Sequence, residues 1–274
     1  MKKLITRAIT GIVLVFVMLS SILASAYSFA VLFLFILIAS IYEFNNLFKQ
    51  SEVKPNLVLS YLVSVALFIL SFLSANGIAE TRYIFIVLPL LFATMATELY
   101  RKKLNPVETI ATTIFGIIYI ALPLSLINFL VFPEFIAANT YNPTLLIAIF
   151  SLIWIYDSGA YLVGVSIGKH RLFERISPKK SWEGAIGGTI FAVLAAYFIS
   201  GFVPEIKMVH WIAIGMLVVV SATFGDLTES MFKRHFGIKD SGNILPGHGG
   251  MLDRFDSLFF VVPAVFTYIK VFIG

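Results

Sequence analysis

Apolar runs of about 20 residues, the length that crosses a bilayer as a helix, recur throughout this chain of 274 residues. Helices suit such runs because helical hydrogen bonds satisfy the backbone polar groups that lipid cannot. Charged residues make up 13% of the chain, which is about half of their usual share in soluble domains. The sequence therefore predicts an all-α protein, a polytopic transmembrane helical bundle.

The hydropathy pattern predicts about nine spans. They cover residues 8–26, 28–48, 57–75, 83–100, 107–131, 143–166, 184–203, 209–228 and 256–273. If the N-terminus is cytoplasmic, only Arg82, Lys207 and Lys270 of the 20 Lys and Arg residues fall on the outer side. Because basic residues collect in cytoplasmic loops, this bias predicts a cytoplasmic N-terminus and an outer C-terminus. It also explains most of the net charge of +5, so the charge does not indicate a nucleic-acid partner.

The two halves of the chain differ in polar content. Residues 1–140 form N-terminal spans without recognisable chemistry. In that half Glu43, Glu98 and Glu108 lie near span ends, and we expect interfacial or structural roles for them. We expect residues 141–274 to combine C-terminal spans with cytoplasmic catalytic loops, for the reasons given below. Because the chain has no cysteine, disulfides and thiolate metal sites are excluded.

The first span also has the features of a secretory signal. It has a basic start, an apolar run and the small residues Ala24-Ser25-Ala26. We expect this segment to be retained as a span, and cleavage is the alternative.

The first polar residue that lipid accommodates poorly is Asp157, within the sixth predicted span. An ionised carboxylate there is costly unless it is paired, hydrated or bound to a cation. We expect a substrate-binding role, and a satisfied structural aspartate is the alternative. In the same region the glycine pairs Gly164/Gly168 and Gly184/Gly188 predict close helix packing.

The loop of residues 168–184 carries a dense cluster of basic residues. Lys169 and Arg171 are explained by the preference for positive charge in cytoplasmic loops. The stretch SPKKSWEG differs, because Ser177-Pro178 predicts a turn and Lys179-Lys180 directly precedes the seventh span. Lysines beside a helix N-terminus bind phosphate well, since free N–H groups and the helix dipole add to their charge.

Charge and glycine also concentrate between the last two spans, in KRHFGIKDSGNILPGHGGMLDRFD. Asp226 and Ser230 are four residues apart and share a helix face, as do Asp253 and Asp256, three apart. The three carboxylates lie at the cytoplasmic ends of consecutive predicted spans. Hard oxygen ligands converging near basic residues suit Mg²⁺ and a polyphosphate. The alternative role of the two acids on the last span is pairing with the helix dipole.

The glycines of this stretch, Gly247, Gly249 and Gly250, predict close approach of the backbone to a ligand and positive φ angles. Among the histidines, only His248 is expected to take part in chemistry. We expect loop or interfacial positions for the other three, His170, His210 and His235.

The run from Ser230 to Asp256 resembles the signature of CDP-diacylglycerol synthases, also called phosphatidate cytidylyltransferases. The matching residues are Ser230, Lys233, Arg234, Lys239, Asp240, Gly242, Pro246, His248, Gly249, Gly250, Asp253, Arg254 and Asp256. SPKKSWEG resembles a second segment of that family, with Ser181 where threonine is common. The resemblance implies that CTP and phosphatidic acid give CDP-diacylglycerol and pyrophosphate at the cytoplasmic face of the inner membrane. It also implies that the reaction depends on Mg²⁺ and that the protein forms a homodimer. Whether a second cation binds stays open.

Together the residues and the resemblance predict the following roles. The expected catalytic residues are Asp226, Asp253, Lys239, Arg254 and His248. The expected substrate-binding residues are Ser177, Lys179, Lys180, Lys233, Arg234, Gly249, Gly250 and Asp157. The expected metal ligands are Asp226, Asp253 and Asp256. The alternative functions are a CTP-dependent polyprenol or phytol kinase and a cation-coupled transporter.

Overall fold

A computed structural model describes residues 2–101, 104–136 and 138–274 of the chain, with the side chains of α1 described from Ile9 onward. The chain divides into two compact units. The first takes its described residues from Met1–Pro133, Ala137–Tyr141 and Asp240–Phe255, and the second from Glu134–Ile136, Asn142–Lys239 and Asp256–Gly274.

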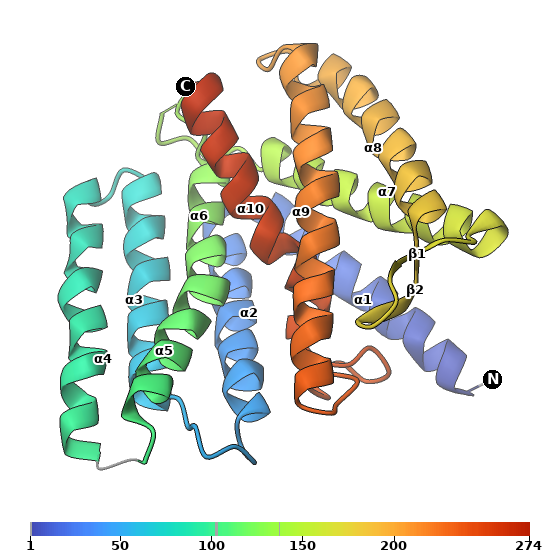
Figure 1. Cartoon of the computed structure of the whole chain (residues 1–274). Helices are drawn as coiled ribbons and strands as arrows, with labels where there is room; N and C mark the ends of the chain where they lie inside the picture. Colours follow the sequence, from blue (N-terminus) through green and yellow to red (C-terminus); the bar gives the residue numbers. More distant parts are fainter. Residues whose placement is uncertain (1, 102–103, 137) are drawn as a thin grey trace. The chain divides into compact units, whose positions relative to one another are not determined.

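The first unit consists of helices. They are α1 (Lys2–Ala24), α2 (Ala26–Leu47), α3 (Leu57–Ala75), the 3₁₀ helix η1 (Thr81–Ile86), α4 (Val87–Arg101), α5 (Pro106–Gly116), the π-helical segment η2 (Ile117–Ala121) and α6 (Leu122–Val131). Within this unit α3 packs on α6, and α2 packs on α1 and α3 (Figure 1). The π segment lies directly before Pro123, which has no N–H to donate to the preceding turn.

The second unit is built on three packed helices. They are α7 (Thr144–Ile167), α8 (Trp182–Phe202) and α9 (Met208–His235), and the short strands β1 (Arg171–Phe173) and β2 (Ser177–Ser181) form a hairpin between the first two. Helix α8 packs on both α7 and α9 (Figure 1). The helix α10 (Leu252–Phe272) begins in the first unit and continues in the second from Asp256. Large buried side chains fill each core, for example Phe33 and Phe68 in the first unit and Trp211 in the second.

The backbones of α7 and α8 approach closely at glycines. A Cβ added at Gly184 would lie 2.7 Å from the carbonyl oxygen of Ala160 and 3.1 Å from the Cα of Gly164. One added at Gly188 would lie 2.8 Å from the carbonyl oxygen of Tyr156. Close contact of this kind stabilises helix pairs in lipid, where burial of apolar surface gives little driving force. The predicted close packing at these glycines is confirmed.

The predicted polytopic helical bundle is also confirmed. In the described residues, eight helical segments are long and apolar enough to span a membrane, and Ile9–Ala24 is a shorter apolar helix. Three predicted ends differ clearly from the structure, since α1 begins at Lys2, α9 continues to His235 and α10 begins at Leu252. A span predicted from hydropathy ends at the first charged residues. A helix can continue beyond them when charged side chains one turn apart form ion pairs, as Glu229 and Lys233 do on α9.

The predicted turn at Ser177-Pro178 is wrong. Both residues belong to β2, whose antiparallel partner β1 pairs Phe173 with Ser177 and Arg171 with Ser181. The turn occupies residues 174–176 instead. Pro178 is tolerated because this hairpin has only two strands, so each strand has a free edge that needs no N–H donor.

The orientation in the membrane can be tested with single cysteines, because the chain has none of its own. Glu174 lies exposed in the turn of the hairpin, and Glu205 lies exposed between α8 and α9. The bias in basic residues predicts that an impermeant maleimide added to intact cells labels Glu205→Cys but not Glu174→Cys. Permeabilised cells should label both variants. The reverse pattern in intact cells would show that the chain is inverted.

Candidate functional site

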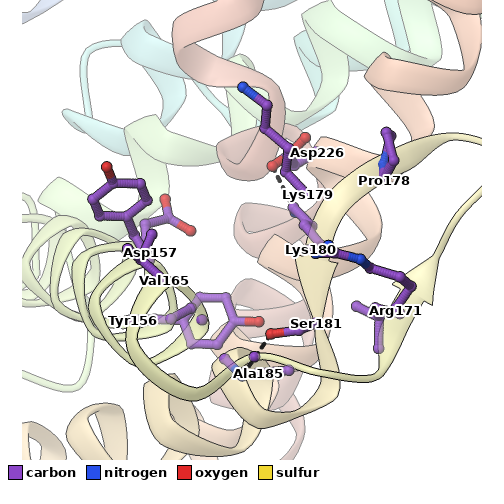
Figure 2. Close-up of a pocket in the computed structure, with 16 residues that line it drawn as sticks. Tyr156, Asp157, Val165, Arg171, Pro178, Lys179, Lys180, Ser181, Ala185 and Asp226 are labelled. Atoms are coloured by element: carbon purple, nitrogen blue, oxygen red, sulfur yellow. Dashed lines mark hydrogen bonds and ion pairs between the residues drawn. The ribbon is translucent and has the colours of Figure 1, made fainter.

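A cavity of about 580 Å³ opens in the second unit (Figure 2). Its walls come from α7, the hairpin, the first turn of α8 and α9. The volume falls within the range of roughly 300–1,000 Å³ typical of small-molecule sites. One part of the wall is apolar, with Val165 and Leu172 as examples, and the other part is charged. The cavity therefore suits a ligand that has both ionic and apolar groups.

The charged wall carries cations from the hairpin and carboxylates from two helices. The charged residues that line it are Asp157, Arg171, Lys179, Lys180 and Asp226. The sequence analysis explained Arg171 only by the preference for positive charge in cytoplasmic loops and did not predict that it lines this cavity. Its charge resembles that of any cytoplasmic loop, and only the hairpin geometry distinguishes it from its neighbours.

An ion pair joins the hairpin to α9 inside this cavity. The Lys180 Nζ lies 2.6 Å from Oδ2 of Asp226, and the two side chains are 28% and 35% exposed (Figure 2). The other carboxylate oxygen of Asp226 accepts a hydrogen bond of 3.1 Å from the Ser230 hydroxyl. The predicted shared face of Asp226 and Ser230 is thus confirmed, and the carboxylate is held from two sides.

The first turn of α8 follows the two lysines directly, as a phosphate site requires. Ser181 is the N-cap of the helix, and its hydroxyl accepts a hydrogen bond of 3.1 Å from the N–H of Gly184. Both residues line the cavity, so this helix end and its dipole lie beside the charged wall.

Glu183 fixes the base of the hairpin against α8. Its carboxylate accepts hydrogen bonds from the backbone N–H of Lys169, at 3.1 Å, and of His170, at 3.2 Å. The Nδ1 of His170 lies 2.6 Å from the same carboxylate. The backbone N–H of Trp182 donates in turn to the carbonyl of His170. These contacts set the direction in which β2 presents its lysines.

Two further contacts bring carboxylates of α7, α9 and α10 into one neighbourhood. The hydroxyls of Tyr156 and Thr223 are hydrogen-bonded, which ties α7 to α9. A Cβ at Gly225 would lie 2.7 Å from the carbonyl oxygen of Asp256, so α10 passes close to α9 beside Asp226.

Because these helices lie close together, their charged side chains in the second unit interact with one another. Asp157 interacts electrostatically with Lys180 and Asp226. Asp256 interacts with Asp226, Lys233 and Asp157. Among the described residues, however, no three His, Asp or Glu side chains converge closely enough to form a metal site.

Asp253 belongs to the first unit, where it orders the loop before α10. Its Oδ2 accepts hydrogen bonds from the Ser241 N–H at 2.9 Å, the Ser241 hydroxyl at 3.0 Å and the Gly250 N–H at 2.8 Å. Gly249, with φ of +82°, and Gly247, with φ of +77°, adopt the predicted left-handed conformation, whereas the same prediction for Gly250 is wrong. A Cβ at Gly249 would lie 2.7 Å from the same carboxylate oxygen. The bare backbone in this loop thus approaches a side chain of the protein itself.

Glu43 also contacts this loop, although it lies on α2 and about 200 residues earlier in the chain. It is 1% exposed, so of the two roles expected for it, interfacial or structural, the structure supports the structural one. Its Oε2 accepts hydrogen bonds from the Leu252 N–H at 2.8 Å and the Ser241 hydroxyl at 3.3 Å. The only signal in the sequence is an acid near the end of an apolar run, and that signal does not distinguish Glu43 from Glu98.

The other predicted site residues lie outside the cavity wall. Ser177 pairs with β1, Lys233 forms an ion pair on α9, and Arg234 donates to the carbonyl of Ile238 at 3.4 Å. Lys239 and Arg254 are exposed. His248 packs against α1, where a Cβ at Gly11 would lie 3.3 Å from its Nε2.

Comparison with known proteins identifies the family. The Cytidylyltransferase family matches residues 5–272. A phosphatidate cytidylyltransferase of Bacillus subtilis (strain 168) is 34% identical over 273 residues, which cover 97% of each chain. A phosphatidate cytidylyltransferase of Staphylococcus aureus (strain COL) is 51% identical over 116 residues, 42% of this chain and 44% of that protein. The match to the staphylococcal protein covers less than half of that protein's length. The family match and the match to the Bacillus protein each cover nearly the whole of this chain. The chain therefore belongs to the cytidylyltransferase family.

Proposed function

We propose that this integral membrane protein condenses CTP with phosphatidic acid to give CDP-diacylglycerol and pyrophosphate. The observation that carries the proposal is the cavity in which Lys179, Lys180 and the first turn of α8 face Asp226. A family of cytidylyltransferases and a relative named for phosphatidate supply the substrate class. The combination of an ionic and an apolar wall matches a nucleotide reacting with a lipid headgroup.

The phosphates of the substrates bind at the charged wall. Lys179, Lys180 and Arg171 supply positive charge, and the N-terminus of α8 adds its dipole. When an anionic ligand arrives, the Lys180 ammonium can exchange part of its interaction with Asp226 for a phosphate oxygen. The signature supplies further basic residues that the resemblance assigns to the phosphates, although none of them lines the cavity: Lys233, Arg234, Lys239 and Arg254.

Mg²⁺, which the family resemblance implies, would take Asp226 as its first carboxylate ligand. The sequence offers Asp253 as the other candidate ligand and Asp256, one turn further along α10, as a group beside the metal or a ligand of a second ion. The fit to Mg²⁺ rests on the acids that interact around Asp226 in the second unit, because Mg²⁺ takes only one or two protein carboxylates and completes its shell with water and phosphate. The ion would offset negative charge on the phosphates and on the leaving pyrophosphate.

In the reaction an oxygen of the phosphatidate phosphate attacks the α-phosphorus of CTP. A new P–O bond forms, the bond to the β-phosphate oxygen breaks, and its electron pair leaves with pyrophosphate. Because a phosphate monoester is already nucleophilic, no strong general base is needed. The protein's contribution is positioning and charge stabilisation by Lys179, Lys180 and the helix end. The family resemblance adds His248, Gly249 and Gly250 of the signature loop as residues that take part in the reaction.

The protein acts in the cell membrane, as its bacterial relatives and its spans suggest. The active face is cytoplasmic, where CTP is available and where the basic residues concentrate. The functional form is a homodimer, as the family resemblance implies.

The reaction is tested by following two labels of CTP with purified protein and phosphatidic acid. The proposal predicts that α-³²P enters the lipid while γ-³²P appears in pyrophosphate. Lipid labelled from γ-³²P, with release of CDP, would instead identify a lipid kinase. Absence of label from both lipid and pyrophosphate would contradict the proposal and leave the polyprenol or phytol kinase and the transporter as the alternatives.

The phosphate-binding role of the hairpin predicts a loss when either lysine is removed. Lys179→Ala and Lys180→Ala should each lower kcat/KM by about 10²-fold or more, the size expected for one charge-stabilising group. Arg175→Ala is the matched control, because Arg175 is exposed in the turn of the same hairpin and does not line the cavity. Initial rates across a CTP titration decide the result, and equal small effects in all three variants would contradict the role.

The metal-binding role predicts a charge requirement at Asp226. Asp226→Asn keeps the size of the side chain but removes its charge, so turnover should fall by about 10²- to 10³-fold and half-saturation should need more Mg²⁺. The Glu174→Gln variant changes an exposed acid of the hairpin turn and should retain normal kinetics. Normal turnover of Asp226→Asn at low Mg²⁺ would show that the aspartate is structural.

A further inference from the structure

A buried carboxylate of the N-terminal half holds the signature loop in the first unit. Glu43 is 1% exposed, and its Oε2 accepts hydrogen bonds from both ends of that loop. One donor is the Ser241 hydroxyl, at 3.3 Å, and the other is the N–H of Leu252, at 2.8 Å. A Cβ at Gly242 or Gly250 would collide with the Glu43 carboxylate. The loop backbone therefore wraps around this group.

Ser241 links Glu43 to Asp253. Its hydroxyl lies 3.3 Å from Oε2 of Glu43 and 3.0 Å from Oδ2 of Asp253, and its N–H donates to Asp253 at 2.9 Å. A serine hydroxyl has one proton, so it donates to one carboxylate at a time. The two acids thus share one loop residue, and a change at Glu43 is transmitted to Asp253 through Ser241.

Burial makes the hydrogen bonds to Oε2 of Glu43 important for the position of the loop. A carboxylate away from water is costly unless hydrogen bonds satisfy it, so the Ser241 and Leu252 donors are held close to Glu43. Helix α1 supports the same loop, since the Thr10 hydroxyl donates to the carbonyl of Pro246 at 3.0 Å. The loop is consequently fixed by helices of the N-terminal half, where the sequence shows no chemistry.

We propose that Glu43 is a positioning residue. It fixes Ser241, Gly250 and Leu252 so that the Asp253 carboxylate has a single orientation at the start of α10. The effect on the loop follows from the contacts alone. The effect on the reaction rests on the proposed function, in which Asp253 takes part.

Amide hydrogen exchange of the purified protein tests the positioning itself. In Glu43→Gln, exchange in peptides covering residues 241–252 should rise about tenfold or more, because the charged acceptor for two loop donors is lost. Glu98→Gln is the matched control, since Glu98 is a second buried acid near a span end of the first unit and pairs with Arg101 instead. Unchanged exchange in Glu43→Gln, or an equal rise in both variants, would overturn the proposal.

Kinetics test the consequence for the reaction. Glu43→Gln and Ser241→Ala should each lower kcat by about 10- to 100-fold, the usual cost of losing a group that orients a ligand, while the KM for CTP stays within a factor of three. Because the two residues act through one contact, the double variant should lose little more than the worse single variant. Independent, multiplying losses would contradict the link. If the wild-type protein makes no CDP-diacylglycerol, the proposed function fails, and hydrogen exchange still decides the role of Glu43.

Discussion

The close contact between α7 and α8 at Gly164 and Gly184 is the constraint on which the cavity depends. Lipid provides little force to drive two apolar helices together, so small residues that let backbones touch decide where helices pair. Once the helices meet there, the chain between them must reverse within a few residues, and it does so as a hairpin. Gly168 and Ser181, at the base of that hairpin, pack on each other. Larger residues at these glycines would separate the helices and move the lysines of β2 away from α9.

The ion pair between Lys180 and Asp226 then keeps two charged groups at the wall of the cavity. In a medium of low polarity an isolated carboxylate is costly, and the Lys180–Asp226 pair offsets that cost while keeping both groups at the cavity wall. The same groups are those that an anionic substrate needs. A transporter would be expected to hold such charges near the middle of its spans, whereas Asp226 lies nine residues from the end of α9. The N-terminal half contributes support, because Glu43 orders the loop that carries Asp253.

Much of this arrangement could be predicted from the sequence because its causes are local. Long apolar runs predict the helices, glycine pairs predict the α7–α8 contact, and a spacing of four residues places Asp226 beside Ser230. The hairpin was not predicted because Ser177-Pro178 is a sequence typical of turns, whereas here Pro178 lies in a strand that has a free edge. Glu43 was missed for another reason. Its partners lie about 200 residues away, and no local pattern separates an acid buried in a loop from one at the membrane surface.

The central claim is that the hairpin and the first turn of α8 bind the phosphates of the nucleotide. A structure of the protein with CTP bound in the presence of Mg²⁺ tests this most directly. The account predicts that phosphate oxygens lie within hydrogen-bonding distance of the Nζ atoms of Lys179 and Lys180, with the metal on Asp226. A nucleotide bound with its phosphates away from the hairpin, and with the Lys180–Asp226 pair undisturbed, would contradict it.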